Sequence, residues 1–124
     1  MKQLLIVFAG GGLGAVARYW LSGAVYRFMS TQFPYGTITV NVLGCFCIGF
    51  LMSFFADRFL VNPDLRLFLT LGLLGGFTTF STFSYETIEL LRAGNTASGI
   101  ANVAYTTLNC LAATWVGSLV GKQL

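Results

Sequence analysis

Four apolar stretches, each long enough to cross a lipid bilayer, occupy almost all of this 124-residue sequence. They cover about residues 4–28, 35–59, 66–92 and 97–120, and about 20 predominantly apolar residues suffice for a transmembrane helix. Only 9% of the residues are charged, whereas soluble domains contain about a quarter. The sequence therefore predicts an all-α membrane protein whose residues 1–124 form a single domain with four transmembrane helices.

The third stretch departs from a simple lipid-crossing pattern between Leu71 and Glu86. Gly75 and Gly76 lie near its middle, and glycine weakens a helix. Hydroxyl residues and phenylalanines follow the glycine pair: Phe77, Thr78, Thr79, Phe80, Ser81, Thr82, Phe83 and Ser84. A broken helix at membrane depth is tolerated only where it is buried in protein or lines a wet cavity. We therefore expect a helix that is interrupted at its centre, with a polar site edged by aromatic rings at the break.

Several classes of function lack the residues that they need. The sequence has no His and only four acidic residues, so acid–base catalysis and metal-dependent hydrolysis are disfavoured. The seven basic residues are scattered, which argues against nucleic-acid binding. Cys45, Cys47 and Cys110 are odd in number and lie in apolar runs, so we expect small buried side chains rather than disulfide or zinc partners. The protein is not expected to be an enzyme.

The first stretch carries a packing motif and a buried charge. Gly10 and Gly14 form a G-x-x-x-G pair, which lets two helix backbones approach closely in lipid. Arg18 lies inside the same stretch, where an arginine costs roughly 3 kcal/mol or more unless it reaches water or a partner. Two interpretations stay open: Arg18 extends toward the membrane surface, or it draws an anion into a vestibule.

Polar side chains also mark the second and fourth stretches. Asn41 lies about one helical turn into the membrane, where its amide either joins two helices or donates to an anion. In the fourth stretch, a row of side chains recurs every four residues along one helix face: Asn102, Thr106, Cys110, Thr114 and Ser118. Such a row indicates either hydrogen bonds between helices or one wall of a polar track. We favour the track, because the third stretch offers a matching polar surface.

The distribution of basic residues only weakly favours one orientation in the membrane. Four spans place both chain ends on one side, with Lys2, Arg58, Arg66 and Lys122 on that side and Arg27 and Arg92 on the other. Four against two is a weak bias under the positive-inside rule, and a chain with a margin near zero inserts both ways. Four helices also share too little interior to bury so many Gly, Ser and Thr residues. A dimer is therefore the expected state.

The third stretch resembles the signature of the Fluc (CrcB) family of small fluoride channels, through the run Gly75-Gly76-Phe77-Thr78-Thr79-Phe80-Ser81-Thr82-Phe83-Ser84. Residues 10–18 and 39–44 resemble further family motifs, and the resemblance extends over essentially the whole chain. It implies an antiparallel homodimer with dual topology in the bacterial cytoplasmic (inner) membrane. It also implies two fluoride pathways and passive fluoride export, which would give the cell resistance to fluoride.

The resemblance implies roles for individual residues as well. It implies a structural Na⁺ at the dimer centre, held by the backbone carbonyls of Gly75 and Thr78. It implies an anion pathway formed by Asn41, Phe80, Phe83, Ser81, Thr82, Asn102, Thr106, Cys110 and Thr114, with Arg18 in the vestibule. Two positions depart from the family pattern, in which Tyr is usual in place of Asn102 and Ser in place of Cys110. Phe77 and Glu86 are left without an assigned role.

Two other functions compete with the channel interpretation. A non-transporting structural subunit of a membrane complex would explain the glycine-rich packing, but it would not explain an interrupted helix with clustered hydroxyls. A small multidrug exporter would need a carboxylate in its first transmembrane helix for proton exchange, and the first stretch has no Asp or Glu. The exporter is therefore the less favoured of the two alternatives.

Overall fold

Four membrane-length helical segments make up the structure, a computed structural model that describes residues 1–58 and 60–124. They are α1 (Lys2–Phe28), α2 (Tyr35–Ala56), the composite segment Pro63–Arg92 and α6 (Thr96–Gln123). The described residues form no strand. The expected all-α fold with four spans is thus confirmed. The second stretch was expected to end at Phe59, which lies outside the described residues.

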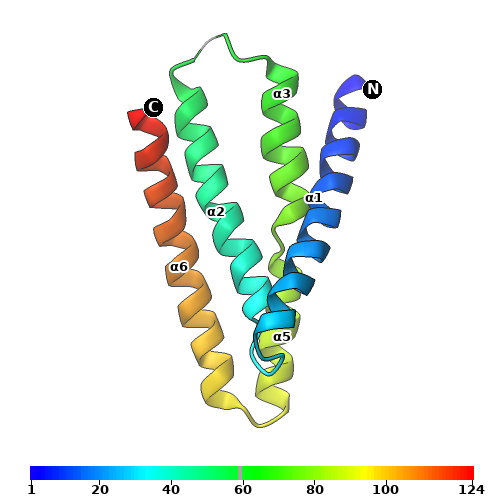
Figure 1. Ribbon diagram of the computed structural model, residues 1–124, viewed down its shortest axis with the longest axis vertical. Coiled ribbons are helices and arrows are strands. Elements are labelled where there is room, and N and C mark those ends of the chain that lie inside the picture. Colours follow the sequence, from blue (N-terminus) through cyan, green and yellow to red (C-terminus); the bar gives the residue numbers. More distant parts are fainter. Residues whose placement is uncertain (59) are drawn as a thin grey trace.

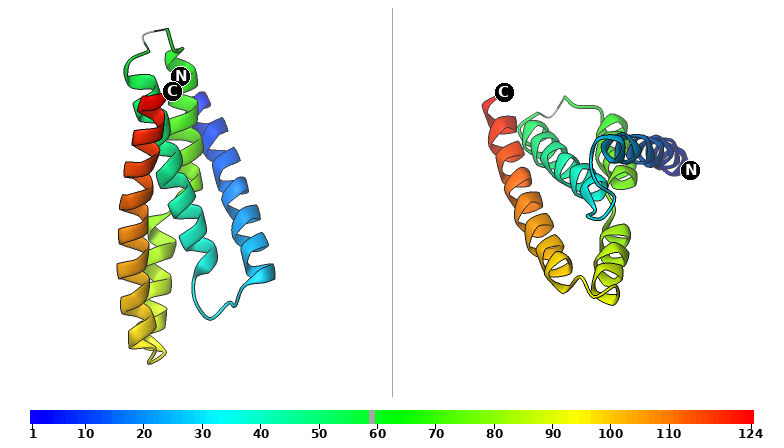
Figure 2. Two further views of the ribbon diagram at one scale, coloured as in Figure 1. Left: turned by 60° about the vertical axis from the view of Figure 1, so that its left-hand side comes forward. Right: turned by 60° about the horizontal axis from the view of Figure 1, so that its bottom comes forward.

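The four segments form two packed pairs. Both chain ends lie at the same end of the molecule (Figure 1), as an even number of spans requires. α2 packs chiefly against α6, whereas α1 packs against the first half of the composite segment. In the view of Figure 1 the two pairs lie farther apart at the end that holds the termini than at the opposite end, and Figure 2 shows the same helices from two other directions.

The composite segment is helical on both sides of a short extended interruption. Its first half consists of α3 (Pro63–Leu67), η1 (Phe68–Leu74) and α4 (Gly75–Phe77), and its second half is α5 (Phe80–Arg92). η1 is a π-helical stretch. π-helical turns are rare overall, and those that interrupt α-helices often lie at functional sites. The interruption predicted at the centre of this span is confirmed. It lies at Thr78 and Thr79, however, while Gly75 and Gly76 remain helical.

α5 has different neighbours from the half of the segment that precedes the break. η1 and α4 pack against α1, whereas α5 packs against α6. A tight turn at Gly94, which has a left-handed φ of 85°, leads from α5 into α6. The expected antiparallel packing of the third and fourth stretches is therefore confirmed for α5. The two extended residues therefore lie between the part of the segment that packs on α1 and the part that packs on α6.

The glycine pair of α1 permits the close helix contact that its spacing predicts. A Cβ atom added to Gly10 would lie 2.9 Å from the Cα of Gly72, and one added to Gly14 would overlap the carbonyl oxygen of Leu73. Gly76 faces the backbone of Gly11 in the same way. The backbones of α1 and the composite segment therefore touch without side chains between them, and this contact explains why Gly76 is a glycine although it lies in the helix before the break.

Glycines also bring α2 and α6 together. A Cβ atom on Gly49 would overlap the carbonyl of Thr114, and Cβ atoms on Gly117 and Gly121 would overlap the carbonyls of Phe46 and Phe50. Small residues at such positions permit the close backbone approach that helps transmembrane helices associate. The G-x-x-x-G spacing of Gly117 and Gly121 is visible in the sequence, but it was not used in the prediction.

We predict that Gly14→Ala destabilises the protein far more than Gly12→Ala. The new methyl group at position 14 would overlap the Leu73 carbonyl, whereas a Cβ on Gly12 has no neighbour within 4 Å. Overpacking of this kind costs about 1–3 kcal/mol, and alanine in place of a helical glycine otherwise favours the helix by about 1 kcal/mol. Thermal unfolding in detergent, followed by circular dichroism, measures both effects. Equal stability of the two variants would contradict the α1 contact.

Candidate functional site

The side-chain amide of Asn41 holds the interruption in place. Its Nδ2 donates to the carbonyl of Thr79 at 2.9 Å, and the Thr79 amide donates to Asn41 Oδ1 at 2.8 Å. Thr78 and Thr79 are both extended, with ψ angles of 155° and 120°. Unpaired peptide groups are costly away from water. Asn41 thus supplies the hydrogen bonds that the interrupted helix cannot make for itself.

The hydroxyl group of Thr79 begins the second half of the helix. Its Oγ1 accepts a hydrogen bond from the Thr82 amide at 3.2 Å, which is the usual way in which a threonine caps a helix N-terminus. The carbonyls of Gly75 and Thr78 lose their usual helical hydrogen-bond partners as a result. In a continuous helix the Thr79 amide would bond the Gly75 carbonyl and the Thr82 amide would bond the Thr78 carbonyl. Here these amides donate to the side chains of Asn41 and Thr79.

Gly75 and Thr78 line a common cavity of about 210 Å³. The cavity lies between α2 and the first half of the composite segment, and its other lining residues are Gly44, Cys45, Ile48, Thr70 and Leu74. Carbonyl oxygens are hard ligands, which suit cations such as alkali and alkaline-earth ions. The two carbonyls expected to hold a cation are therefore the two whose regular helical partners are engaged elsewhere, and their residues share one cavity.

A second cavity, of about 300 Å³, brings together five residues assigned to the anion pathway: Asn41, Phe80, Phe83, Thr106 and Cys110. They come from α2, α5 and α6, and Cys45 and Thr79 also line the cavity. Its wall combines hydroxyl, amide and thiol groups with two aromatic rings. Hydroxyl and amide hydrogens and the positive edges of aromatic rings are groups that can face an anion without a full positive charge.

The three phenylalanines near the break occupy different surroundings. Phe83 is buried, whereas Phe80 is 78% exposed in the single chain, and their ring centroids lie 5.4 Å apart. Phe77 is buried as well, and a Cβ added to Gly44 would lie 3.3 Å from its ring. Phe77, to which the sequence assigned no role, therefore packs against α2, while Phe80 and Phe83 face the 300 Å³ cavity.

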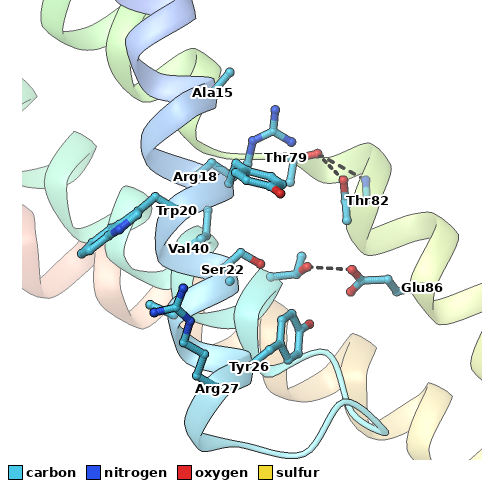
Figure 3. A pocket seen from close by; sticks show the side chains of 14 residues that line it. Ala15, Arg18, Trp20, Ser22, Tyr26, Arg27, Val40, Thr79, Thr82 and Glu86 are labelled. Atoms are coloured by element: carbon cyan, nitrogen blue, oxygen red, sulfur yellow. Dashed lines mark hydrogen bonds between the residues drawn. The ribbon is translucent and has the colours of Figure 1, made fainter.

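A larger cavity of about 610 Å³ lies on the other side of the break and contains Arg18. Figure 3 shows Arg18 and Thr79 toward one end of this cavity and Tyr26, Arg27 and Glu86 toward the other. The Arg18 Nε atom is buried and has no hydrogen-bond partner among the described residues. Thr79 lines this cavity and the 300 Å³ cavity alike, so the break forms part of both walls. The position of Arg18 is compatible with the vestibule interpretation.

Sequence reasoning missed several residues of the larger cavity. Glu86 accepts a hydrogen bond from Thr37 Oγ1 at 2.8 Å, and its second oxygen is buried without a partner among the described residues. Ser22 and Tyr26 of α1 complete this polar end of the cavity. The sequence shows that these polar side chains lie inside apolar stretches. It does not show which of them contact each other across helices.

The row of polar side chains on α6 makes hydrogen bonds between helices at both of its ends. Asn102 is 1% exposed and donates to Thr87 Oγ1 at 2.9 Å, and Thr106 donates to Asn102 Oδ1 at 3.1 Å. Ser118 bonds Ser53 of α2 at 2.6 Å. Between these bonds, Thr106 and Cys110 line the 300 Å³ cavity. One row of residues thus serves helix association at its ends and faces a cavity at its middle.

Comparison with known proteins identifies the family of this chain. The profile of the family described as "CrcB-like protein, Camphor Resistance (CrcB)" matches residues 5–118. The chain belongs to the CrcB family. Curated relatives in Geotalea uraniireducens and Geotalea daltonii are 49% and 50% identical to it over 124 residues, which is the full length of each chain. A relative in Dehalococcoides mccartyi is 44% identical over the whole of this chain and 95% of its own. All three are named "Fluoride-specific ion channel FluC".

The CrcB match spans both cavities and the break between them. Of the residues assigned to the anion pathway, five share the 300 Å³ cavity and Thr82 lines the larger one with Arg18. Ser81, Asn102 and Thr114 line neither of these two cavities in the described part of the chain. Ser81 lies beside the break instead, with its Oγ 3.2 Å from Thr79 Oγ1, and Thr114 donates to the Cys110 carbonyl of its own helix.

Proposed function

We propose that this CrcB-family chain is a fluoride-selective channel that exports fluoride passively across the bacterial cytoplasmic membrane. The observation that carries the proposal is the match of the whole chain, at 44–50% identity, to relatives named as fluoride-specific ion channels. The geometry at the interrupted helix supports it, because hydroxyl groups, an amide and two phenyl rings surround the break. The protein is a channel and not an enzyme.

The residues around the break suit a small and strongly hydrated anion. Such an ion must exchange its water for donors that do not trap it, since conduction needs binding that is strong enough for uptake and weak enough for release. Thr82 and one remaining N–H of Asn41 are neutral donors, whereas the Thr106 hydroxyl already donates to Asn102. The edges of Phe80 and Phe83 add weak positive potential. No lysine is among the described residues that line the two cavities, so no ammonium group lies beside these donors to hold the ion too tightly.

The membrane potential supplies the direction of flow. A potential of about 100 mV, negative inside, drives a monovalent anion outward with about 2.3 kcal/mol. Arg18 in the 610 Å³ cavity provides a positive charge near the break. It attracts fluoride into the vestibule, and the potential then moves the ion through the neutral donors without any coupled energy source.

The functional unit that we propose is an antiparallel homodimer whose subunits insert in both orientations. Phe80 is 78% exposed in the single chain although it belongs to the proposed pathway. The cavity that holds Gly75 and Thr78 also lies between α2 and the first half of the composite segment, which belong to different helix pairs of one chain. A second copy would cover both features. The weak charge bias of the chain agrees with insertion in two orientations.

We also propose that the dimer holds a structural Na⁺ at its centre. The Gly75 and Thr78 carbonyls fit this ion, because they are hard oxygen ligands whose usual helical partners bond elsewhere. A dimer would supply these two carbonyls from each chain. The bound ion would neutralise the converging carbonyl dipoles and thereby hold the two interrupted helices together.

Replacement of Na⁺ by a large organic cation is expected to weaken the dimer. An ion present at about 100 times its dissociation constant stabilises the bound state by about 2.7 kcal/mol. Purified protein is exchanged into N-methylglucamine buffer of equal ionic strength, and the dimer fraction is measured by analytical ultracentrifugation in detergent. Added Na⁺ should restore the dimer. Equal dimer fractions in the two cations would contradict the sodium site.

A growth experiment tests the physiological role. A bacterial strain without its own fluoride exporter is expected to grow in fluoride medium when it expresses this chain, and to fail with an empty vector. Cytoplasmic fluoride, measured with an ion-selective electrode after lysis, should fall in the rescued cells. Unchanged fluoride content and continued sensitivity, with the protein present in the membrane, would contradict the proposed export.

A further inference from the structure

Two cysteines from different helices line the same 300 Å³ cavity. Cys45 lies on α2 and Cys110 on α6, each one helical turn before Gly49 and Thr114, at which the two backbones touch. Both are partly exposed, and both line the cavity that also contains Asn41, Phe80 and Phe83. Cys47, the remaining cysteine of α2, is not part of this lining. The pair therefore differs from a single buried cysteine, because two thiols line one accessible cavity.

The helices that carry the two cysteines are held at a fixed separation. Gly49 packs on the backbone of Thr114 and Gly117 packs on the backbone of Phe46, so these glycine contacts lie on both helices within a few residues of the pair. α2 and α6 also form the most extensive helix contact in the described chain. The two thiols are consequently positioned by the fold before any ligand arrives.

The number of ligands limits the kind of ion that such a pair can hold. No group of three or more His, Cys, Asp or Glu residues occurs in the described chain. A structural zinc ion needs four ligands in a tetrahedral arrangement, so two thiols do not suit it. Soft sulfur ligands select copper(I) and related ions, and such ions accept linear coordination by two sulfur atoms.

We propose that Cys45 and Cys110 form a binding site for a soft monovalent cation, copper(I) or silver(I), and that the bound ion closes the anion pathway. Binding forms one S–metal bond as one thiol releases its proton to water, and the second sulfur coordinates as a neutral thiol. The product has no net charge, which suits a site inside the membrane. Closure follows because the ion joins α2 to α6 within the cavity that Phe80 and Phe83 face. The closure, unlike the binding, rests on the proposed fluoride conduction.

Silver(I) is the probe for the test, because silver fluoride is soluble and chloride can be left out of every solution. Equilibrium dialysis measures silver binding to the full-length protein in detergent, independently of transport. Fluoride efflux from liposomes measures closure. Cys45→Ser and Cys110→Ser each remove one sulfur from the pair, and Cys47→Ser is the matched control on α2.

The wild-type protein and Cys47→Ser should each bind one silver ion per chain, and silver should slow their fluoride efflux about tenfold or more, since an occupied cavity blocks conduction. Cys45→Ser and Cys110→Ser should bind silver about 100-fold more weakly, and silver should not slow the efflux that each variant shows in its absence. Equal silver affinity in all four proteins would overturn the site. Binding at the pair without slower efflux would overturn the closure. If the wild type shows no fluoride efflux at all, the conduction proposal fails, and dialysis still decides whether the thiol pair binds the metal.

Discussion

Asn41→Leu is expected to reduce fluoride efflux on the order of 100-fold, because the interruption loses the side chain that defines it. The variant removes both hydrogen bonds to Thr79 and leaves its amide and carbonyl unpaired. Interhelical hydrogen bonds in membrane proteins contribute about 1–2 kcal/mol each. The free energy of unfolding should therefore fall by about 2–4 kcal/mol in addition to the loss of transport. Efflux from liposomes and thermal unfolding in detergent measure the two effects.

Asn109→Leu provides the matched control for this variant. Asn109 is half-buried on α6 and donates to the Tyr105 carbonyl of its own helix, so its loss leaves the break intact. We expect near wild-type efflux from the control. If Asn41→Leu conducts fluoride as fast as the control does, the hydrogen bonds of Asn41 do not hold the conducting conformation, and the structural basis of the site is wrong.

Phe83→Ile is expected to reduce fluoride efflux by a similar factor, on the order of 100-fold, while the protein stays folded. Phe83 is buried and lines the cavity with Asn41 and Thr106. Isoleucine is apolar and of comparable volume, and such exchanges usually cost under about 1.5 kcal/mol of stability. It has no positive ring edge to face an anion. Efflux should therefore fall much further than stability does.

Phe8→Ile tests whether this effect is specific to the pathway. Phe8 lies on α1 and is largely exposed, away from both cavities. Its replacement should leave fluoride efflux and unfolding almost unchanged. Wild-type efflux from Phe83→Ile would show that the ring packs helices together and takes no part in conduction.

The number of spans and the interrupted helix could be predicted because both follow from local sequence properties. Lipid requires long apolar stretches for spanning helices, and these are visible directly. The glycine pair and the clustered hydroxyls showed that the third helix breaks, but not where. The break lies at Thr78 and Thr79 because Asn41, far away in the sequence, bonds to Thr79. Gly76 is needed for contact with Gly11 instead.

The hydrogen bonds that join different helices could not be predicted either, because their two residues lie far apart in the sequence. Asn102 is visible as a polar residue in an apolar stretch, yet its partner Thr87 is found only from the packing of α5 on α6. Glu86 and Thr37 are a similar case, because they lie on different helices and meet at the larger cavity. The sequence therefore singled out polar residues that line the cavities, and the structure shows which of them lie together.

Fluoride efflux from liposomes that contain only the purified protein tests the central claim most directly. Valinomycin and potassium clamp the membrane potential, and an ion-selective electrode follows fluoride, with a parallel measurement in chloride. Fast fluoride loss that depends on the protein, together with little chloride loss, is the predicted result. An absence of fluoride flux from a well-folded dimer would contradict the channel and favour a structural subunit of a larger membrane complex.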